Sequence, residues 1–553
     1  MLTLKAEAEG PAAAAVLARR VVSPLLDYSA LMKLRRFLLP AGRPDRAAAA
    51  PLRLAVLGGP TTTQLRQLLE VFLAGEGIDA ELYEGGYDLF RQEILTPGSG
   101  LDAFGPQIIF LATGRHQVAR VPEIDADADA VARLAAEEVE DWATLWQAAA
   151  RWNATVIQNT FEIAPGGPLG HYAVRHPAAR ENYLDRLNRL LAERAPATVV
   201  FHDLRGLAAE AGAAWFDPRF YLEFKMPCAP EWLVGYAHSV TSVVRGVLGR
   251  SKKVLVLDLD NTVWGGVVGD AGAGGVQVGQ GTGEGEAFLA FQRYALDLQK
   301  RGVLLAVCSK NDEARAREPF EKRPDMALRL EHISCFVANW QNKADNIRAI
   351  ADRLDLKLDS FVFADDNPAE RAIVRQFLPE VSVPELPEDP AGYVQAVARH
   401  RYFETVAFTR EDAARTQYYA DNARRKEMAA GAVDLGSFLE SLQMRMTVEP
   451  VHDLNIERAT QLMNKSNQFN LNTRRYTVAQ VRDLLAAPDT RTLTFSLADR
   501  LGDNGLISVL MLTTRAGALR VDNWVMSCRV LQRGVEHFTR NCLVDLARQE
   551  GCG

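Results

Sequence analysis

Short apolar runs alternate with amphipathic stretches along the first part of the chain. Five runs, each four to six residues long, read as buried strands, and segments of helical spacing such as 61–73 separate them. These runs lie at 52–57, 80–83, 107–112, 154–158 and 198–201. Because strands that alternate with helices form parallel sheets covered on both faces, residues 51–245 are predicted to be an α/β domain. Residues 1–50 precede it as a helical lead-in and an Ala/Pro/Arg spacer.

A second α/β unit is predicted for residues 252–395. It opens with the nearly pure apolar strand VLVLDLD, which begins at Val254, and later strands are expected at 304–308, 335–338 and 361–364. Residues 396–443 are polar and helix-prone and are predicted to be a connector. Four further strand patterns, interspersed with two or three helices, predict an α+β domain over residues 444–553.

Composition and charge narrow the class of protein. The 553 residues include 48% hydrophobic and 24% charged side chains, which is ordinary for globular domains. A net charge of −7 makes nucleic acid or an anionic membrane an unexpected main partner. The six cysteines include no CxxC pair, which argues against a zinc site and a disulfide framework. With no signal-peptide pattern at the start, a cytoplasmic location is expected.

The strongest chemical signal is the pair Asp258 and Asp260 at the end of the first strand of the second unit. In α/β sheets this end of a strand faces the ligand. There one carboxylate can act as a nucleophile and the other as an acid or base, and together they can hold Mg²⁺. The alternative is a pair of loop carboxylates that cap a helix.

Three later features favour the catalytic interpretation. Ser309 ends the strand LLAVCS, Lys343 lies in NWQNKADNI, and Asp365 with Asp366 ends the strand FVFADD. Each of them is expected where a doubly wound sheet exposes its strand ends. A hydroxyl, a cation and metal-binding carboxylates beside a nucleophile are the components of phosphoryl transfer.

Residues 253–390 resemble the haloacid dehalogenase superfamily, and the motifs DLDNTVWGGVVGD, VCSKND, NWQNKADNI and FADDNPAER resemble its FkbH-like branch. The resemblance implies that Asp258 is the phospho-accepting nucleophile and Asp260 the general acid/base. It implies that Ser309 and Lys343 stabilise the phosphoryl group. The implied Mg²⁺ ligands are Asp258, the backbone carbonyl of Asp260, and Asp365 and Asp366, without a decision on which of the last two touches the metal.

The same resemblance implies a substrate and a partner. An FkbH-like protein is expected to dephosphorylate 1,3-bisphosphoglycerate and to load the glyceryl unit onto the phosphopantetheine thiol of an acyl carrier protein, in polyketide-type biosynthesis. Two alternatives remain: a plain phosphatase acting on a small or carrier-bound phosphoester, and a non-catalytic scaffold that docks carrier proteins.

Acyl transfer from an acyl phosphate to a thiol is easiest through an enzyme thioester, so a reactive cysteine is expected. Cys308 is the first candidate because it precedes Ser309, and Cys528 in the last domain is the second. The competing interpretation of each is inert packing within a strand. The 48 residues between Asp260 and Ser309 can form a small flap but not a cap domain, which predicts an open site.

The last domain resembles the GNAT acyltransferase fold. Arg533 and Gly534 stand between a strand and a helix, where that fold binds a pyrophosphate on backbone N–H groups, although the loop is poor in glycine. Pantetheine without the nucleotide is therefore the expected ligand. Arg474 and Arg475 are expected to meet an acidic carrier protein, or else to lie at a solvated helix start.

The first domain resembles a degenerate SGNH-hydrolase fold. Its first loop, GGPT from Gly58, has no serine at the nucleophile position, and Arg115 stands where an asparagine is expected. Asp217 and His238 are too far apart in sequence for the usual pair. A serine triad is therefore not expected, and the domain is predicted to be structural or to dock the carrier. Asn159 and Glu162, at a strand end, are candidates for binding a ligand.

Overall fold

The structure is a computed structural model. It describes residues 9–39, 51–408, 435–465, 469–472, 478–515, 517–527 and 533–552, together with single positions at 3, 7, 418, 419, 425, 428, 476, 530 and 531. The chain forms two compact units, Met1–Val247 and Leu248–Gly553.

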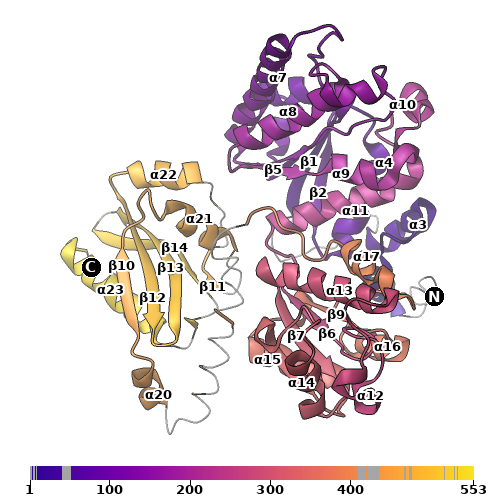
Figure 1. The fold of residues 1–553 in the computed structure, drawn as a ribbon. Helices are drawn as coiled ribbons and strands as arrows, with labels where there is room; N and C mark the ends of the chain where they lie inside the picture. Colours follow the sequence, from indigo (N-terminus) through magenta and orange to yellow (C-terminus); the bar gives the residue numbers. More distant parts are fainter. Residues whose placement is uncertain are drawn as a thin grey trace. The chain divides into compact units, whose positions relative to one another are not determined.

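The first unit is built on a five-stranded parallel sheet (Figure 1). Its strands follow the order β2-β1-β3-β4-β5. They are β1 (Leu52–Gly58), β2 (Ala80–Glu84), β3 (Ile108–Ala112), β4 (Thr155–Asn159) and β5 (Val199–His202). All five predicted strands are present, and the sheet is parallel as predicted.

Amphipathic helices cover this sheet. Trp142 on α7 (Ala128–Ala149) and Tyr183 on α8 (Arg180–Arg194) pack with the strands in one apolar core. The helices α2 (Pro11–Val21) and α3 (Tyr28–Leu38) pack with α4 (Thr63–Gly75), and α11 (Pro230–Val247) also lies against α4. The shorter helices are α5 (Phe90–Leu95), α6 (Gly100–Phe104), α9 (Leu204–Ala211) and α10 (Pro218–Phe224). The predicted lead-in is thus helical, and the spacer at 40–50 lies outside the described residues.

The second unit begins with a four-stranded parallel sheet of order β8-β7-β6-β9. The strands are β6 (Val254–Leu257), β7 (Leu304–Ser309), β8 (Ile333–Ala338) and β9 (Phe361–Ala364). Side chains alternate between two cores: α13 (Gly283–Lys300) and α14 (Glu313–Lys322) pack on one face, and α15 (Lys343–Leu354) and α16 (Pro368–Phe377) on the other. This is the doubly wound arrangement that the sequence predicts.

The remainder of this unit is an α+β fold, as predicted. Its antiparallel sheet has the order β10-β12-β13-β14-β11. The strands are β10 (Arg445–Glu449), β11 (Phe469–Asn470), β12 (Thr490–Asp499), β13 (Gly502–Arg515) and β14 (Ala518–Met526), and the helices are α21 (Ile456–Lys465), α22 (Val478–Ala486) and α23 (Val535–Gln549). Only β11 was not expected, because two residues carry no readable pattern.

Between these sheets the structure describes α17 (Tyr393–Ala398) and α20 (Leu435–Ser441). Within the predicted helical connector, residues 409–417, 420–424, 426–427 and 429–434 lie outside the described residues. In the described part of the chain, no helix combines the length and the apolar character needed to cross a bilayer.

Candidate active site

Two aspartates are brought together by the pairing of β6 with β9. Leu257 is the partner of Ala364 in the parallel register, and the backbone N–H of Asp258 donates to the Ala364 carbonyl at 3.0 Å. Asp258 and Asp365 therefore leave adjacent strands at the same level. The sequence separates them widely, and the register of the sheet makes them neighbours.

Lys343 stands between these two carboxylates. It opens α15, and its Nζ lies 2.5 Å from Asp365 Oδ2 and 3.0 Å from Asp258 Oδ1. All three side chains are buried. Burial alone would lower the pKa of the Lys343 ammonium, but Asp258 and Asp365 together raise it above its usual value. The lysine therefore stays charged and partly neutralises the pair.

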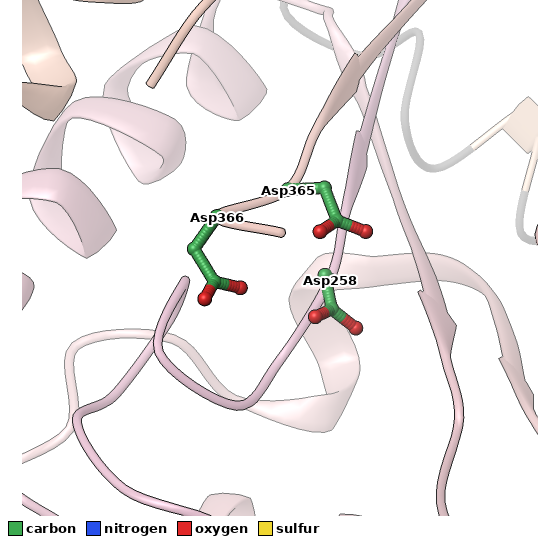
Figure 2. Close-up of side chains that lie close together, drawn as sticks. All are labelled: Asp258, Asp365 and Asp366. Atoms are coloured by element: carbon green, nitrogen blue, oxygen red, sulfur yellow. The ribbon is translucent and has the colours of Figure 1, made fainter. Parts of the chain in front are cut away.

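A third carboxylate completes a cluster suited to a cation. One oxygen each from Asp258, Asp365 and Asp366 lies within 4.8 Å of the others, and Figure 2 shows the three side chains gathered at the strand ends. Apart from its ion pair with Lys343, the buried Oδ1 of Asp258 accepts no hydrogen bond from the described residues. Carboxylate oxygens are the ligands that Mg²⁺ prefers, so this donor set fits it.

Burial shapes the acidity of the cluster. It raises the pKa of Asp258, of Asp365 and of Asp366 above the usual carboxyl range. Lys343 lowers the pKa of the first two but does not cancel the effect of burial. Two buried acids and the half-buried Asp366, with one lysine among them, leave excess negative charge, which a divalent cation would neutralise.

Asp260 faces a different set of partners. Its Oδ1 accepts from Trp264 Nε1 at 2.9 Å and from the Val268 backbone N–H at 3.0 Å, and its Oδ2 accepts from Asn311 Nδ2 at 2.8 Å. These three donors hold the carboxylate beside the metal-fitting cluster rather than within it. The side chain is therefore not one of the three clustered donors, and its acid/base role stays a prediction.

Asn311 is the residue that the sequence analysis did not single out. It is buried, and besides Asp260 its Nδ2 also contacts Ser309 Oγ at 3.3 Å. Asn311 therefore links the predicted hydroxyl donor Ser309 at the end of β7 to the predicted acid/base. Its place two residues after the strand end was the available signal.

The structure corrects the expectation for Cys308. Its thiol is fully buried in the apolar core beneath α15, with Sγ 3.8 Å from the Lys343 carbonyl. Burial raises the pKa of this thiol far above its usual value, which favours inert packing over a nucleophilic role. Side chains alternate along β7, and Cys308 shares the face of Leu304 and Ala306 rather than that of Val307.

The segment between β6 and β7 carries only a small flap. Residues 261–282, all described, contain the short helix α12 (Val268–Gly275), and two isolated bridges, Asp260 to Trp264 and Gly265 to Gln277, tie the segment together. Asn261 has a left-handed φ of 54°, and its side chain accepts from the Gly266 backbone N–H at 2.8 Å. No cap domain lies between these two strands, as predicted from their spacing.

In the last sheet, Arg533 and Gly534 lie where the sequence suggested, at the start of α23. Gly534 has a left-handed φ of 78° as the residue before the helix. The Arg533 guanidinium lies 3.7 Å from the buried carboxylate of Asp499, which Arg425 also pairs with. Ligand binding there remains a prediction. Arg474, Arg475 and Cys528 lie outside the described residues.

In the first unit, Asp217 and His238 each make contacts of their own and do not form a serine triad. Asp217 caps α10 and pairs with Arg219, whereas His238 packs on Phe72. A different chain of hydrogen bonds, from Ser239 to His202 to Asn159, has contacts of 2.9 and 2.8 Å. All three residues are buried, and the chain ties α11 to the ends of β5 and β4 within the core.

Comparison with known proteins places the chain in a family. The family described as "FkbH, N-terminal domain" matches residues 53–245. A solved structure, the N-terminal part of the protein BF1531 from Bacteroides fragilis, contains a phosphatase domain complexed with Mg. It is 34% identical, with a TM-score of 0.62, and the match covers 69% of this chain and all (100%) of that one.

A fungal multi-domain GH3 β-N-acetylglucosaminidase with a GCN5-related glucosamine N-acetyltransferase region also matches, over 97% of this chain and 64% of that one. At 12% identity and a TM-score of 0.16 this match carries no argument. A search of curated proteins found no match. The parallel sheet with its aspartate cluster is that of the haloacid dehalogenase superfamily. Within it, the chain belongs to the FkbH-like family.

Proposed function

We propose that this FkbH-like protein is a Mg²⁺-dependent phosphatase that also transfers a glyceryl unit from 1,3-bisphosphoglycerate to the phosphopantetheine thiol of an acyl carrier protein. The observation that carries the phosphatase is the Asp258–Lys343–Asp365 contact beside Asp366. The relative from Bacteroides fragilis, with a phosphatase domain complexed with Mg, supports the same activity. The substrate and the carrier rest on the family resemblance.

In the proposed phosphatase half-reaction, an Asp258 oxygen attacks the phosphorus of a phosphate ester. The bond from phosphorus to the leaving oxygen breaks, and Asp260, held by Asn311, gives that oxygen a proton. Water then attacks the aspartyl phosphate, with Asp260 taking its proton, and inorganic phosphate leaves. Mg²⁺ held by Asp258, Asp365 and Asp366 would supply charge neutralisation at the phosphoryl oxygens.

The proposed acyl transfer joins the carrier thiol sulfur to the C1 carbonyl carbon. The bond from C1 to the phosphate oxygen breaks, and the phosphate leaves with the proton of the thiol. Because Cys308 is buried, this step does not pass through that thiol. An open site supports access by a long carrier-borne arm, and Trp340, 75% exposed in the loop before Lys343, offers it an apolar surface.

A plain phosphatase is the second candidate, since it needs the aspartate cluster and no cysteine, and Cys308 is buried in the core. A carrier-docking scaffold is the third, and the buried Lys343 contacts argue against it because a scaffold gains nothing from such a cluster.

Intact-protein mass spectrometry separates the three. The protein would be mixed with Mg²⁺, 1,3-bisphosphoglycerate generated in place and a phosphopantetheinylated carrier, and phosphate would be measured in parallel. The proposal is supported if wild-type protein adds a glyceryl-sized mass, without phosphate, to the carrier and Asp258→Asn protein does not. Phosphate release without a carrier adduct supports the plain phosphatase. If protein whose Mg²⁺ binding has been verified gives neither signal, the carrier-docking scaffold is the function that remains.

A further inference from the structure

The carboxyl edge of the first sheet carries a polar cluster that the proposed chemistry does not use. The loops after β3 and β4 meet there, and the buried carboxylate of Glu162 accepts the backbone N–H of Arg115 at 3.1 Å. A Cβ on Gly114 would lie only 2.7 Å from Glu162 Oε2, so the loop passes directly against the carboxylate. In open α/β sheets this edge is where ligands bind.

Three cations gather around this loop. Arg115 Nε lies 3.7 Å from Glu162 Oε1, and Arg180 at the start of α8 donates to the Arg115 carbonyl at 3.2 Å. Lys225 Nζ lies 5.3 Å from the ring centre of Tyr221, which stacks on His116 at 3.6 Å. Burial, followed by Arg115, Arg180 and Lys225, lowers the pKa of His116 to about 4, so His116 is neutral near pH 7.

The carboxylate does not balance these charges. Burial raises the pKa of Glu162 to about 7 even though Arg115 and Arg180 lower it. Burial and the neighbouring Arg115 lower the pKa of Arg180, which indicates that the two guanidinium groups repel each other. The cluster therefore retains excess positive charge at neutral pH, and perturbed groups in such a place are typical of binding sites.

We propose that Arg115, Arg180 and Lys225 bind the phosphate group of a ligand at this edge, a function separate from the aspartate site. Guanidinium forks match the oxygens of a phosphate, and a phosphate ester carries a charge of about −1.5 to −2 that suits the excess. Such a site needs no serine nucleophile. Its phosphate comes either as the free ion or as the end of an organic ester.

Hydrogen–deuterium exchange of the full chain locates the binding. EDTA keeps divalent cations away, the probes are inorganic phosphate and sn-glycerol 3-phosphate, and potassium chloride of equal ionic strength is the blank. We expect slower exchange in residues 113–118 and 160–165 with a probe present. Arg180→Gln protein should need at least about ten times more probe for the same protection, as expected for a lost charge-assisted bond. Arg186→Gln, an exposed arginine on the same helix, should not.

The outcomes are distinct. Stronger protection by the ester than by inorganic phosphate identifies an organic phosphate, and equal or weaker protection identifies the free ion. Absence of protection at 113–118 with both probes, or protection confined to the strand ends around Ser309 and Asp365, overturns the proposal. Equal protection of wild-type and Arg180→Gln protein also overturns the proposal. Exchange in unbound Arg180→Gln protein that matches the wild type shows that the variant is folded.

Discussion

Asn311 Nδ2 donates to Asp260 Oδ2 at 2.8 Å, and this hydrogen bond joins the end of β7 to the loop after β6. Asp260 lies 51 residues earlier in the chain, and two further donors from the flap fix its other oxygen. The position of the predicted acid/base is thus set by groups that take no part in the chemistry.

Asn311→Ala should slow the reaction without weakening substrate binding. With one of its three donors gone, Asp260 samples orientations away from the leaving group, and a loss of about tenfold in kcat is expected with KM little changed. Steady-state phosphate release measures it. Asn182→Ala, which removes two half-buried hydrogen bonds in the first unit, is the control. An unchanged kcat would show that Asp260 needs no support from Asn311.

Cys308→Ser should retain both phosphate release and carrier loading. The thiol is buried and protonated, so its loss affects stability only: a hydroxyl in this apolar core costs about 1–3 kcal/mol of unfolding free energy. Chemical denaturation and carrier mass spectrometry test the two parts. Cys335→Ser, at a buried cysteine on the neighbouring strand, is the matched variant. Selective loss of carrier loading by Cys308→Ser would show that this thiol takes part in the acyl transfer.

Asp366→Asn should raise the Mg²⁺ concentration needed for half-maximal activity by about tenfold or more. Asp366 contributes one of three clustered oxygens, and Thr262 Oγ1 holds it at 3.3 Å. Titration of activity with Mg²⁺ measures the change, and Asp359→Asn, at an exposed carboxylate in the turn before β9, serves as a control. Identical Mg²⁺ curves for wild-type and Asp366→Asn protein would remove Asp366 from the ligand set.

Trp340→Ala should reduce carrier loading while hydrolysis of p-nitrophenyl phosphate continues. The indole is 75% exposed beside the start of α15, where it can contact a carrier-borne arm but not a small phosphate bound at the aspartates. Apolar indole surface covered by the arm contributes roughly 25 cal/mol per Å², so a rise in carrier KM of a few-fold is expected. Phe377→Ala, at an exposed aromatic on α16, should change neither activity. Equal losses of both activities would point to misfolding of the loop instead.

Stability of the first unit should fall as pH rises from about 4.5 to 7. The folded Glu162 carboxyl keeps its proton up to a pKa of about 7, whereas the unfolded group loses it near 4.5, so the native state binds more protons across this window. The difference corresponds to about 3 kcal/mol of unfolding free energy, all of it lost above pH 7. Exchange rates of β4 amides across this pH range, corrected for intrinsic exchange, measure it.

Glu162→Gln is the companion to that measurement. It keeps an acceptor for the Arg115 N–H and carries no titrating proton, so its stability should vary less between pH 4.5 and 7 than that of the wild type. A wild-type slope of the opposite sign, with stability rising across this window, would show that the two arginines outweigh burial at Glu162.

The amino-acid sequence by itself determined the strands other than β11, the parallel class of the first two sheets and the α+β character of the last part, because apolar runs and their periods are local properties of the chain. It also placed Asp258, Ser309, Lys343 and Asp365 at strand ends, since each directly follows an apolar run or opens a helical one. Which side chains meet was decided by tertiary structure alone. The β6–β9 register brings Asp258 beside Asp365, and the two-residue alternation of β7 turns Cys308 into the core. The Arg115–Arg180 cluster was equally invisible in the sequence, because its members become neighbours only when separate loops reach the same edge of a sheet.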